Sequence, residues 1–460
     1  MAKPDLAAIG EFVTAALRNL SDGFDLPEGP AHTPPGAARI SDVLAETAAR
    51  MADNYPYFHP LYAGQMLKPP HPVAHAAYAM AMAVNPNNHA RDGGRASSAM
   101  ELEAVTEIAG IFGWRAFLGH LTSGGTFANL EALWVAGQTA PGRRIAASAQ
   151  AHYTHSRISA VLGLECVEIP ADTQGRMDLA ALETSLRQSD IGTVVVTLGT
   201  TALGAVDPLA EVLKLRDRYG FRVHVDAAYG GYFTLAQNLG AEARRHYDAA
   251  GKADSIVIDP HKHGLQPYGC GCVLFRDPSV GRFYKHDSPY TYFTSTDLHL
   301  GEISLECSRA GASAVALWAT QRLLPLVPGG EFAQGLEAGR EAALELHRRL
   351  QASPYAIAPL LPELDIVVWA LRGKNAEESS ARARAAFEQA ARQDLHLALV
   401  QLPVNLFGHD AWNGLDAQGS SGVVTCLRSV LMKQEHRLWM DAIWSRLQSA
   451  ISVAMASVGQ

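Results

Sequence analysis

Strand-like and helix-like segments alternate along the middle of the chain. Short apolar runs, several of them rich in β-branched residues, occur at residues 143–150, 166–171, 193–201, 221–228, 254–259 and 272–277. Segments with helical spacing of apolar positions occur at residues 101–112, 178–188 and 208–220. The last of these has Pro208 at its start and Gly220 at its end, where helices prefer these residues. This alternation predicts a mostly parallel sheet with helices on both faces.

The two ends of the chain have different patterns. Residues 1 to about 55 are helix-like, with a Pro/Gly-rich break at residues 26–36. Such a segment is either an arm that wraps a partner subunit or a pair of surface helices. After Gly330, long helical patterns alternate with strand-like runs, which is typical of a smaller α+β domain. We therefore predict an N-terminal helical segment (1–75), a large α/β domain (76–328) and a small C-terminal domain (329–460).

Composition narrows the class of protein. The 460 residues include 38 basic and 46 acidic side chains, so the net charge is 38 − 46 = −8, and 48% are hydrophobic. The hydrophobic fraction excludes a largely disordered chain, and the negative net charge does not indicate nucleic-acid binding. We expect no membrane span, because no apolar run approaches ~18 residues. No secretory signal is visible, and five cysteines are an odd, sparse set, so we expect a cytoplasmic protein without a disulfide framework or a metal site.

Two polar residues follow predicted strands at the edge where such sheets bind ligands. Lys262 comes just after the strand at residues 254–259, and Asp226 ends the strand before it. A carboxylate at the end of an apolar strand is costly to bury without a cation. Ala227, Ala228 and the glycines after them leave room for a flat group. Taken singly, a solvated lysine and a helix-capping aspartate are the alternatives.

Two further segments add candidate binding groups. Residues 123–126, Ser-Gly-Gly-Thr, lead directly into a helical pattern, and free N–H groups at a helix start attract anions. His152 follows a short strand, and its flat ring could stack on an aromatic ligand. A plain N-cap and a structural histidine are the alternatives. No glycine-rich dinucleotide motif and no P-loop motif occurs.

Together, these groups match the needs of one cofactor. Pyridoxal phosphate has a phosphate, a flat pyridine ring, a ring nitrogen to keep protonated and an aldehyde to bind covalently. The chain offers an anion cradle, a stacking group, a buried carboxylate and an amine, in that order, each at a strand end.

At these residues the chain resembles the group II pyridoxal-phosphate-dependent amino acid decarboxylases, which have the aspartate-aminotransferase-like fold (fold type I). The resemblance rests on HVDAAYGG, DPHK and the AH before small polar residues, and it covers roughly residues 55–330 well. It implies that Lys262 would bind the cofactor's aldehyde, Asp226 would pair with the ring nitrogen, and His152 would stack on the ring. The remaining cofactor contacts that it implies are Ala228 on the opposite ring face, Thr201 near the 3′ oxygen, and Gly125, Thr126, Ser255 and His261 at the phosphate.

Within the family, the segments HKHGLQPYG and SPYTYF look most like bacterial tyrosine decarboxylases. The resemblance implies an amino acid decarboxylase that releases CO2 and an amine, with a tyrosine-like substrate favoured. It also implies a homodimer in which Tyr290, or Tyr292 two residues on, reaches the neighbouring subunit's site as proton donor. The substrate-binding candidates are Tyr62, Gln65, His89, Tyr268 and Arg428, where Arg428 would anchor the carboxylate.

Several alternatives remain open at this point. An acidic substrate would need a second cation, which Lys68 or Arg91 could supply. Another enzyme on the same fold, such as an aminotransferase, a desulfurase or a decarboxylation-dependent oxidase, would use the same cofactor. A catalytically silent binding protein is the alternative from a different class.

Overall fold

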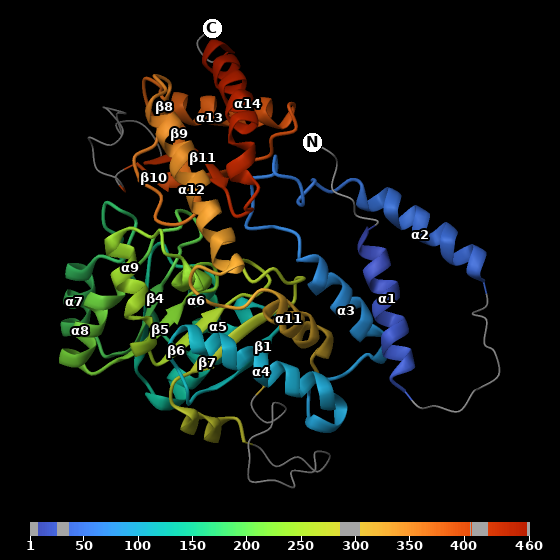
Figure 1. Ribbon diagram of the computed structural model, residues 1–460. Helices are drawn as coiled ribbons and strands as arrows, with labels where there is room; N and C mark the ends of the chain where they lie inside the picture. The colour runs from blue at the N-terminus through green and yellow to red at the C-terminus, as the bar shows by residue number, and fades with distance from the viewer. Residues whose placement is uncertain (1–7, 25–35, 286–303, 405, 407–421, 458–460) are drawn as a thin grey trace.

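A computed structural model describes residues 8–24, 36–285, 304–404, 406 and 422–457 (Figure 1). Two β-sheets organise this part of the chain. The larger sheet carries helices on both faces, and the smaller sheet lies beside it with three long helices (Figure 1). No helix of the described residues has both the length and the apolar character that crossing a membrane requires.

The large sheet has seven strands in the order β1-β7-β6-β5-β4-β2-β3. Their bounds are β1 Leu118–Thr122, β2 Arg144–Ser148, β3 Cys166–Ile169, β4 Ile191–Thr197, β5 Arg222–Asp226, β6 Ser255–Ile258 and β7 Gly271–Phe275. Only β7 runs antiparallel to its neighbours, so β1 has the same direction as the other five strands. The prediction of a mostly parallel sheet is confirmed.

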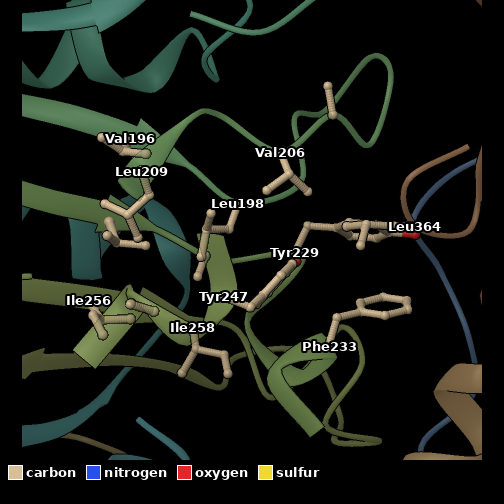
Figure 2. Close-up of a cluster of buried hydrophobic side chains, with 14 of the residues drawn as sticks. Val196, Leu198, Val206, Leu209, Tyr229, Phe233, Tyr247, Ile256, Ile258 and Leu364 are labelled. Carbon is tan, nitrogen blue, oxygen red and sulfur yellow. The ribbon is translucent and has the colours of Figure 1, made fainter. Parts of the chain in front are cut away.

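Alternation along the strands decides which helices cover each face. Val195 of β4 packs on the face covered by α5 and α6, whereas Val194 and Val196 pack on the opposite face. The helices of the first face are α5 Gly125–Thr139 and α6 Thr154–Val161. Those of the second are α4 Arg95–Ile111, α7 Leu179–Gln188, α8 Leu209–Tyr219, α9 Ala241–Asp248 and α11 Gly311–Leu323. Figure 2 shows part of the core on this second face, where Ile256 and Ile258 of β6 lie near Leu198.

The smaller sheet is antiparallel, in the order β10-β11-β9-β8. Its strands are β8 Ala356–Ile357, β9 Ile366–Leu371, β10 Ala398–Pro403 and β11 Val423–Val430, and its helices are α12 Glu331–Gln351, α13 Ala376–Ala391 and α14 His436–Ser457. Trp369 is fully buried at the centre of its core, and Leu61 and Ala63 from the N-terminal segment pack there too. The predicted α+β character of this region is confirmed.

Helices precede the large sheet, as expected. They are α1 Ala8–Asp22, α2 Ala37–Met51 and α3 Pro72–Val84. Elsewhere in the chain, short 3₁₀ helices occur at η1 Arg91–Gly93, η2 Gly231–Leu235, η3 Ala250–Lys252 and η4 Pro278–Phe283. The helix α1 packs against α3, while α2 stands away from the two sheets (Figure 1). The domain limits at residues 76 and 329 remain predictions.

Candidate active site

A cavity of about 460 Å³ lies where the carboxyl ends of β1, β2, β4, β5 and β6 meet the start of α5. Parallel strands bring the residues that follow them to one edge of the sheet, which is where such folds bind ligands. The lining consists of Ser123, Gly124, Gly125, Thr126, Phe127, Asn129, His152, Thr154, Thr197, Gly199, Thr201, Asp226, Ala228, Tyr229, Asp259, His261 and Lys262.

Lys262 lies in the turn after β6 and points its amine into this cavity. Its Nζ atom is 3.0 Å from Oδ2 of Asp259, and its backbone N–H donates to the carbonyl of the same residue. The neighbouring His261 is buried, which lowers the pKa of its ring. The site therefore holds an amine that is positioned by a carboxylate and flanked by a largely uncharged imidazole.

Asp226 ends β5 and presents a buried carboxylate to the cavity. Its Oδ1 accepts the backbone N–H of Ala228 at 3.1 Å, and its Oδ2 lies 2.8 Å from Nε2 of His155. Burial by itself would raise the pKa of Asp226. The hydrogen bond from His155 and the charges of His155 and Lys262 outweigh burial and hold the pKa of Asp226 well below its usual range. The carboxylate is thus ionised.

The start of α5 forms the anion cradle that the glycines predict. Gly124 has φ 154°, a backbone angle that residues with a side chain rarely adopt, and no side chain caps the helix. A Cβ atom on Gly125 would lie 2.6 Å from Oδ2 of Asp259, so only glycine fits there without displacing that carboxylate. The uncapped N–H groups at this helix start suit a phosphate.

His152 lies between β2 and α6 at the edge of the cavity. Its Nδ1 is 2.8 Å from Oγ1 of Thr154, which sets the orientation of the ring. Burial lowers the pKa of His152, so the ring is a neutral flat surface at neutral pH.

Most of the predicted cofactor-binding residues come together in this cavity. They are Gly125, Thr126, His152, Thr201, Asp226, Ala228, His261 and Lys262. Their individual contacts with a cofactor remain predictions.

Ser255 is a correction to the predicted set. It begins β6, at the strand end away from the ligand edge, and its buried hydroxyl lies 2.9 Å from Nδ1 of His224. The residue is absent from the cavity lining. Its hydroxyl is part of the sheet's buried polar contacts, so the predicted phosphate contact for Ser255 is wrong.

The predicted substrate-binding residues lie outside the lining of this cavity within the described part of one chain. The ring of Tyr268 lies 4.7 Å from that of His261, which lines the cavity. Arg428 is buried on β11, and Tyr62 is buried beside the small sheet.

The other two substrate candidates and the loop tyrosines complete the set. Gln65 is exposed, and His89 is half-buried just before η1. Tyr290 and Tyr292 lie outside the described residues.

Two residues of the site were missed by sequence reasoning. Asp259 follows β6 directly, as Asp226 ends β5, so its position at a strand end was an available signal. His155 meets Asp226 across 71 positions of the chain, and no pattern in the sequence indicated this contact.

Comparison with known proteins identifies the family. The family profile described as "Pyridoxal-dependent decarboxylase conserved domain" matches residues 140–353. The probable L-tyrosine/L-aspartate decarboxylase of Methanothermobacter thermautotrophicus is 31% identical over 260 residues, which cover 55% of this chain and 67% of that enzyme. The chain belongs to the pyridoxal-dependent decarboxylase family.

One further relative and one solved structure are similar to this chain over most of its length. The L-tyrosine decarboxylase of Enterococcus faecium is 27% identical over 472 residues, covering 78% of this chain and 77% of that enzyme. The crystal structure of Oryza sativa TDC with PLP and tryptamine superposes with a TM-score of 0.78 at 17% identity, over 99% of this chain and 100% of that one. The predicted fold type I architecture is thereby confirmed.

The chain is a pyridoxal-phosphate-dependent enzyme, a carboxy-lyase that acts on amino acids. The residues present fit this cofactor. Lys262 supplies an amine, Asp226 an ionised carboxylate, and the start of α5 a phosphate cradle. Within the described residues, Nδ1 of His261 is buried without a hydrogen-bond partner beside this cradle, as a ligand contact would require.

Proposed function

We propose that this enzyme decarboxylates an aromatic, tyrosine-like L-amino acid and releases CO2 and a primary amine. The observation that carries the proposal is the presence of Lys262 and Asp226 in one cavity, opposite the glycine cradle of α5. A binding protein without catalysis would not need an amine, a buried anion and a phosphate site in this arrangement.

In this proposal, each cofactor-binding group has one task. Lys262 would hold the cofactor through its amine. Asp226 keeps the proton on the ring nitrogen, while His152 and Ala228 confine the two faces of the ring. The bound cofactor supplies an electron sink for the electron pair that remains when CO2 leaves.

The remaining contacts orient the cofactor. The backbone and side chains of Gly125, Thr126 and His261 hold the phosphate, and Thr201 approaches the 3′ oxygen of the ring. The support for these assignments is that all four residues line the same cavity.

On the substrate side, Arg428 anchors the carboxylate and Tyr290 returns a proton to the α-carbon. Tyr62, Gln65, His89 and Tyr268 contact the side chain. The position of the Tyr268 ring against His261 supports an aromatic contact at the cavity's edge. The similarity to the L-tyrosine decarboxylase of Enterococcus faecium and the probable L-tyrosine/L-aspartate decarboxylase of Methanothermobacter thermautotrophicus supports a tyrosine-like substrate.

An acidic amino acid is the second candidate, because two buried cations lie beyond the cavity near Tyr62. The amine of Lys433 lies 5.2 Å from the centre of the Tyr62 ring, and Arg428 is 6% exposed. Neither cation has an ion-pair partner among the described residues. Burial lowers the pKa of Lys433 to about 7, which an approaching carboxylate would reverse. Lys68 is a further cation nearby, with its amine 3.2 Å from the backbone carbonyl of Met432, and the exposed Arg91 is the other candidate.

A substrate screen tests the proposal. The enzyme loaded with pyridoxal phosphate is given each common L-amino acid, CO2 release is measured, and the product is identified by mass spectrometry. The proposal predicts tyramine from tyrosine as the fastest reaction, and β-alanine from aspartate would favour the second candidate. A keto acid would indicate an aminotransferase, and an aldehyde with ammonia an oxidase.

We also propose that the enzyme is a cytoplasmic homodimer that shares its active site across the interface. All five cysteines are free, which supports a reducing compartment. Apolar side chains of α1 and α2 are exposed in a single chain, among them Phe12, Val43 and Leu44 at 59%, 54% and 61%. A second copy of the chain would cover this apolar surface.

A further inference from the structure

We infer that His155 is a positioning residue for Asp226: it fixes the rotation of the Asp226 carboxylate and keeps its negative charge directed at the cavity. This inference rests on the proposed function, because it assumes that the ring nitrogen of the cofactor meets Asp226. His155 itself is absent from the cavity lining and acts through Asp226.

The contacts of Asp226 leave its carboxylate little freedom. Nε2 of His155 lies 2.8 Å from Oδ2, and the backbone N–H of Ala228 holds Oδ1. The two side chains of His155 and Asp226 are 2% and 6% exposed, so no bulk water replaces either contact. Each oxygen therefore has one fixed donor, which leaves the remaining lone pairs to face the cavity.

The hydrogen bonding of His155 is directed at Asp226 alone. Its Nδ1 atom is buried without a partner among the described residues. The nearby ring of His224, which is also buried, uses both nitrogens, with Nε2 at 2.8 Å from Asn129 and Nδ1 at 2.9 Å from Ser255. His224 thus connects β5 to α5 and β6 by hydrogen bonds, whereas the single side-chain hydrogen bond of His155 goes to Asp226 in the active site.

The start of α6 couples this contact to the stacking residue. The backbone N–H of His155 donates to the carbonyl of His152 at 3.1 Å, so one turn places both rings. His152 lines the cavity, and His155 lies behind Asp226. The same turn therefore sets the ring-stacking group and the orientation of the carboxylate.

Removing the His155 donor would leave Oδ2 of Asp226 buried without its partner. A buried carboxylate in that state rotates toward another donor or takes up a proton, and either change weakens its pairing with a ring nitrogen. The loss would be specific to the ring nitrogen, because the His155 side chain has no hydrogen-bond partner other than Asp226 among the described residues, and its backbone contact with His152 stays in place. This specificity separates a positioning role from a general structural role.

The test compares two ligands of the apoprotein: pyridoxal phosphate and its 1-deaza analogue, in which a CH group replaces the ring nitrogen. Affinities are measured by fluorescence titration without substrate. Wild type should prefer pyridoxal phosphate, and Asp226→Ala should lose that preference. His155→Phe should reduce it by about tenfold or more, the scale of a hydrogen bond to a charged group.

Matched variants keep the test decisive. His155→Gln retains an N–H donor and should keep most of the preference, whereas His155→Met, of the same length without a donor, should lose it. This pair replaces His155→Phe if that variant does not fold. His224→Gln serves as the control, and it should lower stability while leaving the preference unchanged.

The inference is overturned if His155→Phe and His155→Met lower both affinities equally or leave the preference intact. A wild-type protein that binds pyridoxal phosphate without preferring it over the analogue would instead refute the role proposed for Asp226. Wild-type protein that binds neither ligand would refute the proposed function itself.

Discussion

At the scale of single residues, the site depends on buried charges with specific partners. Asp226 is 4% exposed and remains ionised, because the hydrogen bond from His155 and the charges of His155 and Lys262 outweigh the effect of burial on its pKa. An ionised carboxylate here would keep a ring nitrogen protonated, which makes the cofactor a strong electron acceptor. The charge of Asp226, more than its volume, should therefore determine the rate.

Replacing Asp226 tests this claim. Asp226→Ala should raise the barrier of decarboxylation by about 3 kcal/mol, which corresponds to roughly a hundredfold slower turnover. Asp226→Asn, which keeps the shape but removes the charge, should be slowed to a similar extent. Steady-state kcat measures both variants, with thermal unfolding as the control for folding. Wild-type turnover in either variant would contradict the role of the charge.

The buried His224 should make the free energy of unfolding depend on pH. Burial, with a smaller effect from His155, lowers the pKa of His224 to about 3, whereas the unfolded chain binds this proton near pH 6.5. The unfolded state therefore takes up the proton first as pH falls, and stability is lost between pH 6.5 and pH 3. The free-energy advantage of wild type over His224→Gln should shrink by about 1 kcal/mol from pH 7.5 to pH 5.5 in urea unfolding. An advantage that does not change with pH would show that folding leaves the pKa of His224 unshifted.

Residue types at strand ends predicted part of this site from the sequence. Lys262 and Asp226 were found because each follows an apolar strand, and parallel strands share a ligand edge. Ser255 was placed at the phosphate on resemblance alone, although it begins its strand and so lies at the other end. His155 was missed because its role depends on a turn of α6 behind β5, a contact between residues 71 positions apart that no local pattern shows.

At the scale of elements, the start of α5 has to approach two other segments closely. Gly124 adopts a backbone angle that favours glycine, and Gly271 of β7 lies so near that a Cβ there would meet the Gly124 backbone at 2.5 Å. This close packing brings the free N–H groups of α5 to the edge of the sheet where Asp259 and Lys262 lie.

Adding one methyl group to this cradle should weaken cofactor binding. Gly125→Ala would clash with the Asp259 carboxylate that contacts Lys262, and overpacking of this kind costs about 1–3 kcal/mol. We expect at least a tenfold loss of pyridoxal phosphate affinity by titration. Gly110→Ala on α4 is the matched control, since its Cβ meets open space, and it should stabilise the protein slightly. Equal affinities in the two variants would argue against a cradle at α5.

The elements themselves were largely predictable. The strands from β2 to β6 were expected from their short apolar runs, and all of them except the edge strand β3 are almost fully buried. β1, with the sequence Leu-Gly-His-Leu-Thr, carries one β-branched residue and was not expected as a strand. The antiparallel direction of β7 has no local signal either, because direction depends on the connection and not on the residues of the strand.

At the scale of the whole molecule, the N-terminal helices have an apolar face that a single chain leaves exposed to water. Helix α2 stands away from the two sheets (Figure 1), and Ile40, Val43 and Leu44 are at least half exposed on it. Burying such side chains contributes about 1.5–3 kcal/mol each. The proposed homodimer accounts for this face.

Charges on α2 should therefore weaken the dimer. The double variant Val43→Glu with Leu44→Glu should shift the mass from dimer toward monomer by light scattering and lose most activity. Leu438→Glu, at a position on α14 that is 75% exposed, should leave both unchanged. A double variant that stays dimeric and active would show that α2 does not form the interface.

The central claim is that pyridoxal phosphate is held covalently by Lys262 in the cavity that contains Asp226. The most direct measurement is borohydride reduction of the cofactor-loaded enzyme, followed by digestion and mass spectrometry of the labelled peptide. We expect one cofactor per chain, attached to Lys262, and no label in Lys262→Ala. Label on another lysine, such as Lys68 or Lys433, or no label at all, would contradict it.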